Sequence, residues 1–173
     1  MKSTIHPNES WYKVIKSSEG NRALHASVAF QPGEIITGFR ISRLLPNPTR
    51  HSIQYNASKH MLIAPEFLRL TNHSCDPNIT IHTRDLYVKA VRPIEPGDEL
   101  VYFYPSTEWS MAEPFQCCCE SPRCLIHIRG AAYLPMHVLA GYYLNDHIKA
   151  LIGNQREISA PRPYRGPQVG TEP

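Results

Sequence analysis

Apolar and polar residues alternate in short stretches over the first two-thirds of the chain, a pattern typical of half-buried strands. The segment from Leu24 to Phe30, for example, has an apolar side chain at every second position. Similar stretches predict strands at 11–16, 24–30, 35–39, 52–55, 60–63, 79–82 and 86–91. We therefore expect a mainly β protein assembled from several short strands.

Proline and glycine residues divide these strands from one another. Pro32-Gly33 and Pro96-Gly97 each combine a fixed φ with a residue that tolerates positive φ, which favours tight turns. The Pro-Asn-Pro run at 46–48 indicates a loop between residues 41 and 50. No segment repeats at the fixed period that a solenoid requires.

The last third of the chain has a different periodicity. Apolar residues recur there at helical spacing, namely Leu134, Val138, Leu139, Tyr142, Tyr143, Ile148, Leu151 and Ile152. Asn145-Asp146 divides this stripe, so we expect two short helices that pack on the core. From residue 154 onward the chain is rich in proline and glycine, which predicts a disordered tail over 154–173.

Composition narrows the class of protein. With 173 residues, 42% hydrophobic and 19% charged, the chain has the size and make-up of one globular domain. No apolar window is long enough to span a bilayer, and the first residues lack the apolar core of a signal peptide. We expect a soluble intracellular protein without a membrane partner. The net charge of +3 comes from scattered basic residues, so direct nucleic-acid binding is not expected.

Five cysteines provide the first candidate chemistry. Three consecutive thiols, Cys117 to Cys119, are followed by Cys124, and Cys75 lies some forty residues earlier. Disulfides within such a run are sterically poor, whereas thiolates at these spacings can wrap a tetrahedral zinc ion. We predict a site made by Cys75, Cys117, Cys119 and Cys124, with Cys118 pointing away. The alternative is a set of buried thiols without metal.

Two further segments accompany the cysteines. The first is Asn72-His73-Ser74-Cys75-Asp76-Pro77-Asn78, and the second is Gly97-Asp98-Glu99-Leu100-Val101-Tyr102-Phe103-Tyr104. With the three-cysteine cluster, these motifs resemble the SET-domain protein-lysine methyltransferases that carry a post-SET zinc cap. The resemblance covers residues 11–129 and implies a SET-type β-clip, in which small curved sheets are tied by a pseudoknot. It also implies a boundary scheme: SET domain 1–113, post-SET zinc-binding segment 114–130 and C-terminal helical extension 131–153.

The resemblance assigns roles to individual residues. It implies cofactor contacts by Arg22, Ala23 and Leu24 in an N-terminal loop, by Asn72 and His73, and by Tyr104. It places Tyr104 nearest the transferred methyl group and Tyr102 on the wall of a lysine channel, so these two are the candidate catalytic residues. Asn78 matches a residue that ties the knot. Without their flanking motifs, the two tyrosines would be interpreted as core aromatics.

The implied cofactors are S-adenosylmethionine and a structural Zn²⁺, and the implied partner is a lysine-containing protein or peptide. An apolar aromatic channel favours the neutral amine that attacks the methyl group. The hydroxyl of Tyr102 crowds a methylated amine, which predicts mono- or dimethylation. The sequence departs from the family pattern at Phe103 and across residues 105–109, and the insert between residues 39 and 68 is short. Two alternatives therefore stay open: a small-molecule substrate on the same fold, or a non-catalytic peptide-binding module.

Overall fold

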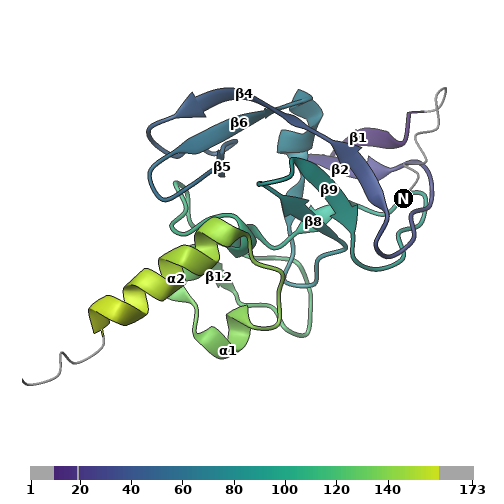
Figure 1. The fold of residues 1–173 in the computed structure, drawn as a ribbon. Coiled ribbons are helices and arrows are strands. Elements are labelled where there is room, and N and C mark those ends of the chain that lie inside the picture. The colour runs from purple at the N-terminus through teal and green to yellow at the C-terminus, as the bar shows by residue number, and fades with distance from the viewer. Residues whose placement is uncertain (1–9, 19, 160–173) are drawn as a thin grey trace, which may run out of the picture.

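A computed structural model describes residues 10–18 and 20–159 of the chain. Within these residues the strands form five small sheets, three of two strands and two of three strands, and the helices follow near the C-terminus. Figure 1 shows the sheets that contain β1, β4 and β8 gathered in one half of the molecule, and the helices α1 and α2, with β12 beside them, on the opposite side. No helix in this described part is both long and apolar enough to cross a membrane. The mainly β architecture predicted from the sequence is confirmed.

The first sheet pairs β1 (Tyr12–Lys16) with β2 (Arg22–Ala26) in antiparallel register, with Val14 opposite Leu24. We expected the second strand to run on to Phe30, and this prediction is wrong. The backbone N–H of Ala26 donates to Asp98 and its carbonyl accepts from Gly97, so the chain changes partner there. Phe30 then forms an isolated bridge with Ile94.

The second sheet has the order β3-β9-β8, formed by β3 (Ile35–Gly38), β9 (Tyr87–Ala90) and β8 (Ile79–His82). Every side chain of β8 is buried, so this strand lies in the interior. The predicted turn before β3 is present: Glu34 N–H donates to the carbonyl of Gln31, and Gly33 has a φ of +87°. Glycine is favoured at that position because side chains disfavour positive φ.

The third sheet has the order β4-β6-β5, formed by β4 (Arg40–Leu45), β6 (His60–Ala64) and β5 (Ile53–Gln54). The loop predicted over 41–50 therefore begins too early, because β4 continues to Leu45. Residues up to Leu45 pair with β6, Leu44 lying opposite Met61. Most β4 side chains are exposed, which weakens the apolar alternation by which a strand is identified.

A parallel pair of short strands ties the middle of the chain together. After the 3₁₀ helix η1 (Glu66–Leu70), β7 (Asn72–His73) pairs with β10 (Val101–Tyr102). Asn78 fixes this crossing with its side chain: Nδ2 donates to the carbonyl of Glu99 and Oδ1 accepts from the N–H of Val101. At 2% exposure this amide is inside the protein, so its full set of partners matters for stability.

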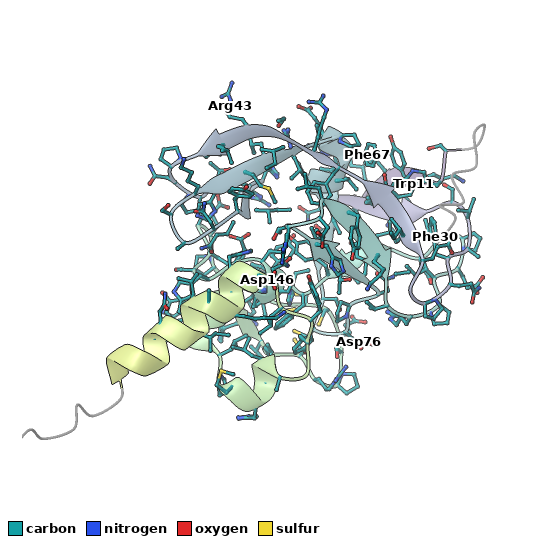
Figure 2. The ribbon with its side chains drawn as sticks, in the orientation of Figure 1. Trp11, Phe30, Arg43, Phe67, Asp76 and Asp146 are labelled. Carbon is teal, nitrogen blue, oxygen red and sulfur yellow. The ribbon has the colours of Figure 1, made fainter. Side chains whose placement is uncertain are left out.

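The main core lies between these sheets. Its fully buried members include Leu24, Met61, Ile63, Ile79, Ile81, Ile94 and Leu100. An aromatic group covers one edge, where the ring of Trp11 meets Phe30 and Phe67 in edge-to-face contacts (Figure 2). Tyr12 stacks on Phe67 with a centroid distance of 3.8 Å. These contacts hold the β1-β2 sheet on the rest of the fold.

The last part of the chain folds back on the sheets. It contains the 3₁₀ helix η2 (Tyr104–Ser106), the hairpin of β11 (Phe115–Gln116) and β12 (His127–Ile128), the 3₁₀ helix η3 (Ala131–Tyr133), α1 (Met136–Leu139) and α2 (Asp146–Ser159). The two predicted helices are present. The helix α2 continues to Ser159, so the tail predicted over 154–173 does not begin at residue 154. Residues 160–173 lie outside the described part.

Asn145 connects this last part to the early strands. Its side chain accepts from the N–H and hydroxyl of Thr83 and donates to the carbonyls of Ile81 and Ser106. The residue is 1% exposed, and the N-terminus of α2 begins immediately after it. The C-terminal helix is therefore joined to the core by a buried polar network as well as by apolar packing.

Candidate active site and metal centre

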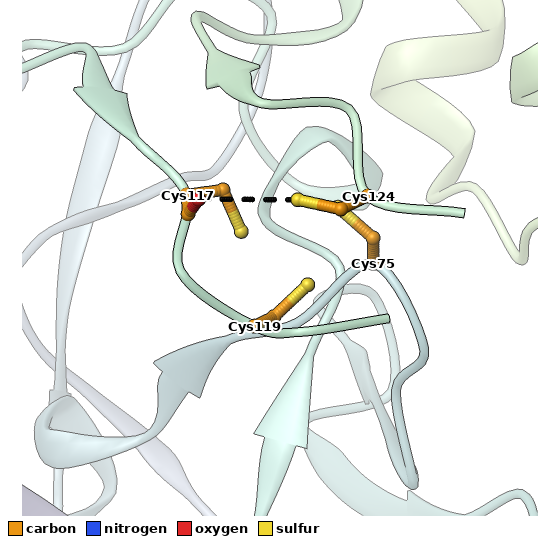
Figure 3. A group of neighbouring side chains, drawn as sticks. All are labelled: Cys75, Cys117, Cys119 and Cys124. Carbon is orange, nitrogen blue, oxygen red and sulfur yellow. Dashed lines mark hydrogen bonds between the residues drawn. The ribbon is translucent and has the colours of Figure 1, made fainter. Parts of the chain in front are cut away.

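The four cysteines predicted to bind metal come together although Cys75 is remote from the others in sequence. Each of the thiols of Cys75, Cys117, Cys119 and Cys124 lies within 4.8 Å of the other three (Figure 3). A tetrahedral zinc ion with Zn–S bonds of about 2.3 Å separates its sulfurs by about 3.8 Å, so the cluster needs only a small contraction. Cys118 is exposed and outside the cluster, as expected. The predicted convergence is confirmed.

The chemistry of the thiols also fits a cation. Burial raises the pKa of Cys75 to about 11, so at neutral pH the free thiol keeps its proton. A bound cation replaces that proton and stabilises the thiolate. Histidine, cysteine and acidic side chains can all bind metals. Among the described residues, these four cysteines form the group whose ligand atoms lie close enough together to hold one ion. They would hold a zinc ion as a structural site with no open position.

Neighbouring groups position the cluster. The N–H of Leu125 points at the sulfur of Cys75 at 3.4 Å, and the hydroxyl of Tyr142 donates to the carbonyl of Cys75 at 2.8 Å. On the surface beside it, Arg123 pairs with Asp76 at 3.1 Å, where Figure 2 labels Asp76 near the sulfur atoms. These contacts join the hairpin β11-β12 to the turn that follows β7.

The candidate catalytic tyrosines lie side by side, Tyr102 as the last residue of β10 and Tyr104 as the first residue of η2. The rings of Tyr102 and Tyr104 have a centroid distance of 4.7 Å and an interplanar angle of 43°. The hydroxyl of Tyr104 donates to the carbonyl of Thr71 at 3.0 Å. Burial raises the pKa of both phenols well above the ordinary value, so both stay protonated. They can therefore act as neutral hydrogen-bonding groups rather than as bases.

Phe103, which replaces an acidic residue of the family pattern, has a packing role. It is 2% exposed and stacks on Tyr142 with a centroid distance of 3.7 Å and an angle of 8°. A carboxylate at this position would be buried against an aromatic ring, at a large cost in free energy. Phe103 thus departs from the family pattern in a way that suits the C-terminal segment, because Tyr142 of that segment packs on its ring.

Five of the predicted cofactor residues belong to two elements that meet: Arg22, Ala23 and Leu24 lie in β2, and Asn72 and His73 form β7. The side chain of Asn72 donates to the carbonyl of Arg22 at 3.4 Å and to the carboxylate of Glu99 at 2.7 Å, so β7 and β2 are joined at this point. Ala23 follows in β2 and is partly exposed. Leu24 has no exposed surface, so its side chain belongs to the core.

His73 lies between the tyrosines and the cysteines. Its Nδ1 accepts from the N–H of Tyr104 at 3.1 Å, and its Nε2 lies 3.3 Å from the sulfur of Cys75. Burial lowers the pKa of this imidazole to about 4, so the ring is neutral and has one donor and one acceptor nitrogen. The imidazole of His73 thus connects the cysteine cluster to the backbone of Tyr104.

One ionisable residue near the tyrosines was missed in the sequence. Glu108 is 7% exposed, and its Oε1 accepts from the N–H of Gln54 in β5 at 2.8 Å. Its Oε2 lies 3.8 Å from Nδ1 of His60. Burial raises the pKa of this carboxyl to about 7. The only sequence signal was indirect, since Glu108 falls in the segment 105–109 that departs from the family pattern.

Comparisons with known proteins agree with this geometry. The family model described as SET domain matches residues 11–105. The methyltransferase flvH of Aspergillus flavus is 34% identical over 163 residues, which cover 92% of this chain and 90% of that protein. A crystal structure of KRYPTONITE with mCHG DNA and SAH aligns with a TM-score of 0.53 at 19% identity, covering 67% of this chain and 28% of that one. The chain belongs to the SET-domain family of methyltransferases.

Proposed function

We propose that this methyltransferase transfers a methyl group from S-adenosylmethionine to the side-chain amine of lysine in a protein or peptide, and that it stops at the mono- or dimethylated product. The observation that carries the proposal is the pair of adjacent rings formed by the buried Tyr102 at the end of β10 and the partly buried Tyr104 at the start of η2. Two neutral phenols side by side form a wall that can orient an amine and exclude water from it.

Catalysis of this reaction requires the protein to align the two reactants more than to supply reactive side chains. S-adenosylmethionine supplies an electrophilic methyl group on a sulfonium, and transfer is an in-line displacement by a neutral amine. Tyr104 is held rigidly, because its hydroxyl donates to Thr71 and its backbone N–H donates to His73. The lone pairs of that hydroxyl are then available to accept from the amine. A low-polarity wall also favours the neutral amine over its ammonium form.

For the cofactor, we propose the surface where β2 meets β7. Arg22 and Ala23 on β2, Asn72 and His73 on β7, and Tyr104 belong to this junction, and Leu24 supports it from the core. The KRYPTONITE structure similar to this fold contains SAH, the product of S-adenosylmethionine after methyl transfer. We further propose Zn²⁺ at Cys75, Cys117, Cys119 and Cys124 as a structural ion that holds the hairpin β11-β12 against the site.

A small-molecule amine is the second candidate substrate, and one observation favours it. The segment after Tyr104 does not leave the site open: Thr107 has no exposed surface, and Glu108 is bonded to β5 of the short insert. A closed segment at this place narrows the approach of a folded protein but admits a free amine.

The test uses the full chain, purified with its metal, and S-adenosylmethionine labelled in the methyl group. One arm is an array of lysine-containing peptides, and the other is a set of free amines that includes lysine and cadaverine. Label on peptides supports protein-lysine methylation, whereas label on free amines alone supports the second candidate. Calorimetry with S-adenosylmethionine is the control. A protein that binds no cofactor and labels neither set would be a non-catalytic module, and the proposal would be wrong.

A further inference from the structure

Glu108 occupies an unusual environment for a carboxyl group. It follows η2 and lies between the β4-β6-β5 sheet and the first turn of α2, two elements that face each other in Figure 1. Its neighbour Thr107 has no exposed surface, and the backbone carbonyl of Glu108 accepts from the N–H of Ala131. The backbone that carries this side chain is therefore held in place, and the carboxyl is held by the N–H of Gln54.

The bonds of Gln54 show how firmly this carboxyl is positioned. The backbone N–H of Gln54 donates to Oε1 of Glu108, and the side-chain carbonyl of Gln54 accepts from the N–H of Trp109 at 2.8 Å. The amide nitrogen of Gln54 donates to the carbonyl of Asn56. The backbone N–H, the side-chain carbonyl and the side-chain amide nitrogen of Gln54 are thus all bonded. The first two of these groups hold the segment that carries Glu108.

The polar atoms on the other side of Glu108 are incompletely bonded. Oε2 lies 3.8 Å from Nδ1 of His60, which is longer than a hydrogen bond. In the described part of the chain, Nδ1 of His60 is buried and has no hydrogen-bond partner. Buried polar atoms are nearly always bonded, so an open nitrogen facing a carboxylate oxygen indicates a place for a third polar group.

The charged and titratable groups around this place are few. From α2, His147 faces His60, but its Nε2 already donates to the carbonyl of Thr107 at 2.9 Å. From β10 and η2, the phenols of Tyr102 and Tyr104 lie close enough to act on Glu108 electrostatically. The charge of Arg50 also acts on Tyr104, but this side chain is 70% exposed and pairs with Glu113. No buried cation balances Glu108 in the described residues.

Thr107 links the carboxyl to the proposed channel. Its hydroxyl donates to the carbonyl of Tyr104 at 3.2 Å. Thr107 therefore connects the backbone of Tyr104 to Glu108, whose carboxylate lies beside His60. In the described residues this carboxylate has no buried cationic partner that would compete with a substrate ammonium ion.

We propose that Glu108, assisted by His60, recognises the substrate as an ammonium ion and accepts its proton before methyl transfer. This step rests on the proposed function. The ammonium N–H bond breaks and its proton passes to Oε2, which leaves a neutral amine and a neutral carboxylic acid. The amine nitrogen then forms its bond to the methyl carbon as the carbon–sulfur bond breaks. The pKa of Glu108, raised to about 7 by burial, suits such an acceptor near neutral pH.

The test measures binding of n-butylamine, a mimic of the lysine side chain, to the protein saturated with S-adenosylhomocysteine. This probe remains an ammonium ion from pH 6 to 9. We expect the wild-type protein to bind it more tightly at pH 8 than at pH 6, because Glu108 becomes charged over that range. The E108Q variant keeps an oxygen that accepts from Gln54, and we expect it to bind at least 10-fold more weakly at pH 8 and without pH dependence.

Glu34 provides the matched control, since its carboxylate also accepts a single backbone N–H, that of Gln31, in a surface turn. The E34Q variant should bind the probe as the wild-type protein does. Equal affinity and equal pH dependence in E108Q, or a wild-type protein that binds S-adenosylhomocysteine but not n-butylamine, would overturn the proposal. If E108Q does not fold, H60N leaves the Gln54 bond intact and should weaken binding several-fold; unchanged binding would also overturn it. Loss of S-adenosylhomocysteine binding in the wild-type protein would instead count against the proposed function itself.

Discussion

Two histidines of the candidate site, His73 beside Tyr104 and His60 beside Glu108, show how differently an imidazole can be used. His73 has both ring nitrogens occupied, one by the N–H of Tyr104 and the other by the sulfur of Cys75. His60 has an unpartnered Nδ1 that faces Glu108 at 3.8 Å. Burial lowers the pKa of both rings. The same residue type thus forms a complete network at His73 and an incomplete one at His60.

The bonding of the two histidines suggests different roles: structural support for His73, and substrate recognition, as proposed above, for His60 with Glu108. A fully bonded histidine fixes its neighbours and has no free nitrogen for a ligand, which suits the position of His73 between the cysteine cluster and Tyr104. An incompletely bonded pair has a free-energy cost in the empty protein that a suitable ligand removes. We therefore expect changes on the His73 side to disturb stability, and changes on the Glu108 side to disturb recognition and pH dependence.

The largest effect is expected from disrupting the cysteine cluster. Replacing Cys75 by serine should abolish zinc binding and lower the free energy of unfolding by on the order of 5 kcal/mol, because metal binding contributes directly to folding. Zinc content and chemical denaturation would be measured on reduced protein. The C118S variant is the control, since this exposed thiol is outside the cluster and should change neither quantity. Wild-type protein purified without zinc would contradict the structural role of the ion.

Next in size is the loss of the Tyr104 hydroxyl. We expect Tyr104→Phe to lower kcat roughly 100-fold, the typical effect of removing one positioned hydrogen-bonding group from a reaction site. Turnover of labelled S-adenosylmethionine would be compared with that of Tyr142→Phe, which removes a hydroxyl bonded to Cys75 on the His73 side. The control should lose about 1 kcal/mol of stability and little turnover. Equal activity of both variants would remove Tyr104 from the mechanism.

A third prediction concerns the stability of E108Q as a function of pH. The pKa of Glu108 is raised from 4.5 to about 7 in the folded protein, so the folded state binds more protons than the unfolded state between these values. Stability of the wild-type protein therefore falls as pH rises through this range, and that loss is roughly 3 kcal/mol. Denaturation should find the two proteins similar at pH 5 and E108Q more stable at pH 8.5. A variant that is less stable at pH 8.5 would show that the native carboxylate has a strong partner.

The smallest effect on rate is expected at Tyr102. Removing its hydroxyl in Tyr102→Phe gives a methylated amine more room, so the product should shift toward a higher methylation state while turnover changes only a few-fold. Mass spectrometry of the product would show the shift. An unchanged product distribution would mean that Tyr102 does not line the acceptor channel.

The sequence was most informative where residue type alone restricts the chemistry. Thiols at the spacing of Cys117, Cys119 and Cys124 have few alternatives to a metal. The family resemblance implied a knot tied by Asn78, and the side chain of Asn78 does bond the two crossing segments. The strand β4 was missed because its side chains are mostly exposed, so that pairing with β6 rather than burial keeps it extended. A pattern of apolar residues cannot reveal a strand of that kind.

Glu108 was missed for a different reason. A glutamate that follows Pro105, Ser106 and Thr107 in sequence has the composition of a solvated turn. Its burial depends on Gln54 from β5 and on Ala131 from η3, which lie far from it along the chain. Long-range contacts of this type leave no periodic trace in the sequence, so the environment of Glu108 could be found only in three dimensions.

The side chain of Asn145 has a consequence for how the protein is made. The ribosome adds this residue 64 positions after Ile81, whose carbonyl it bonds, and 62 positions after Thr83. Until it emerges from the exit tunnel, the end of β8 lacks the side chain that bonds the carbonyl of Ile81 and the N–H of Thr83. This polar network is therefore completed only after the residue that precedes α2, the last helix of the described part, has been synthesised.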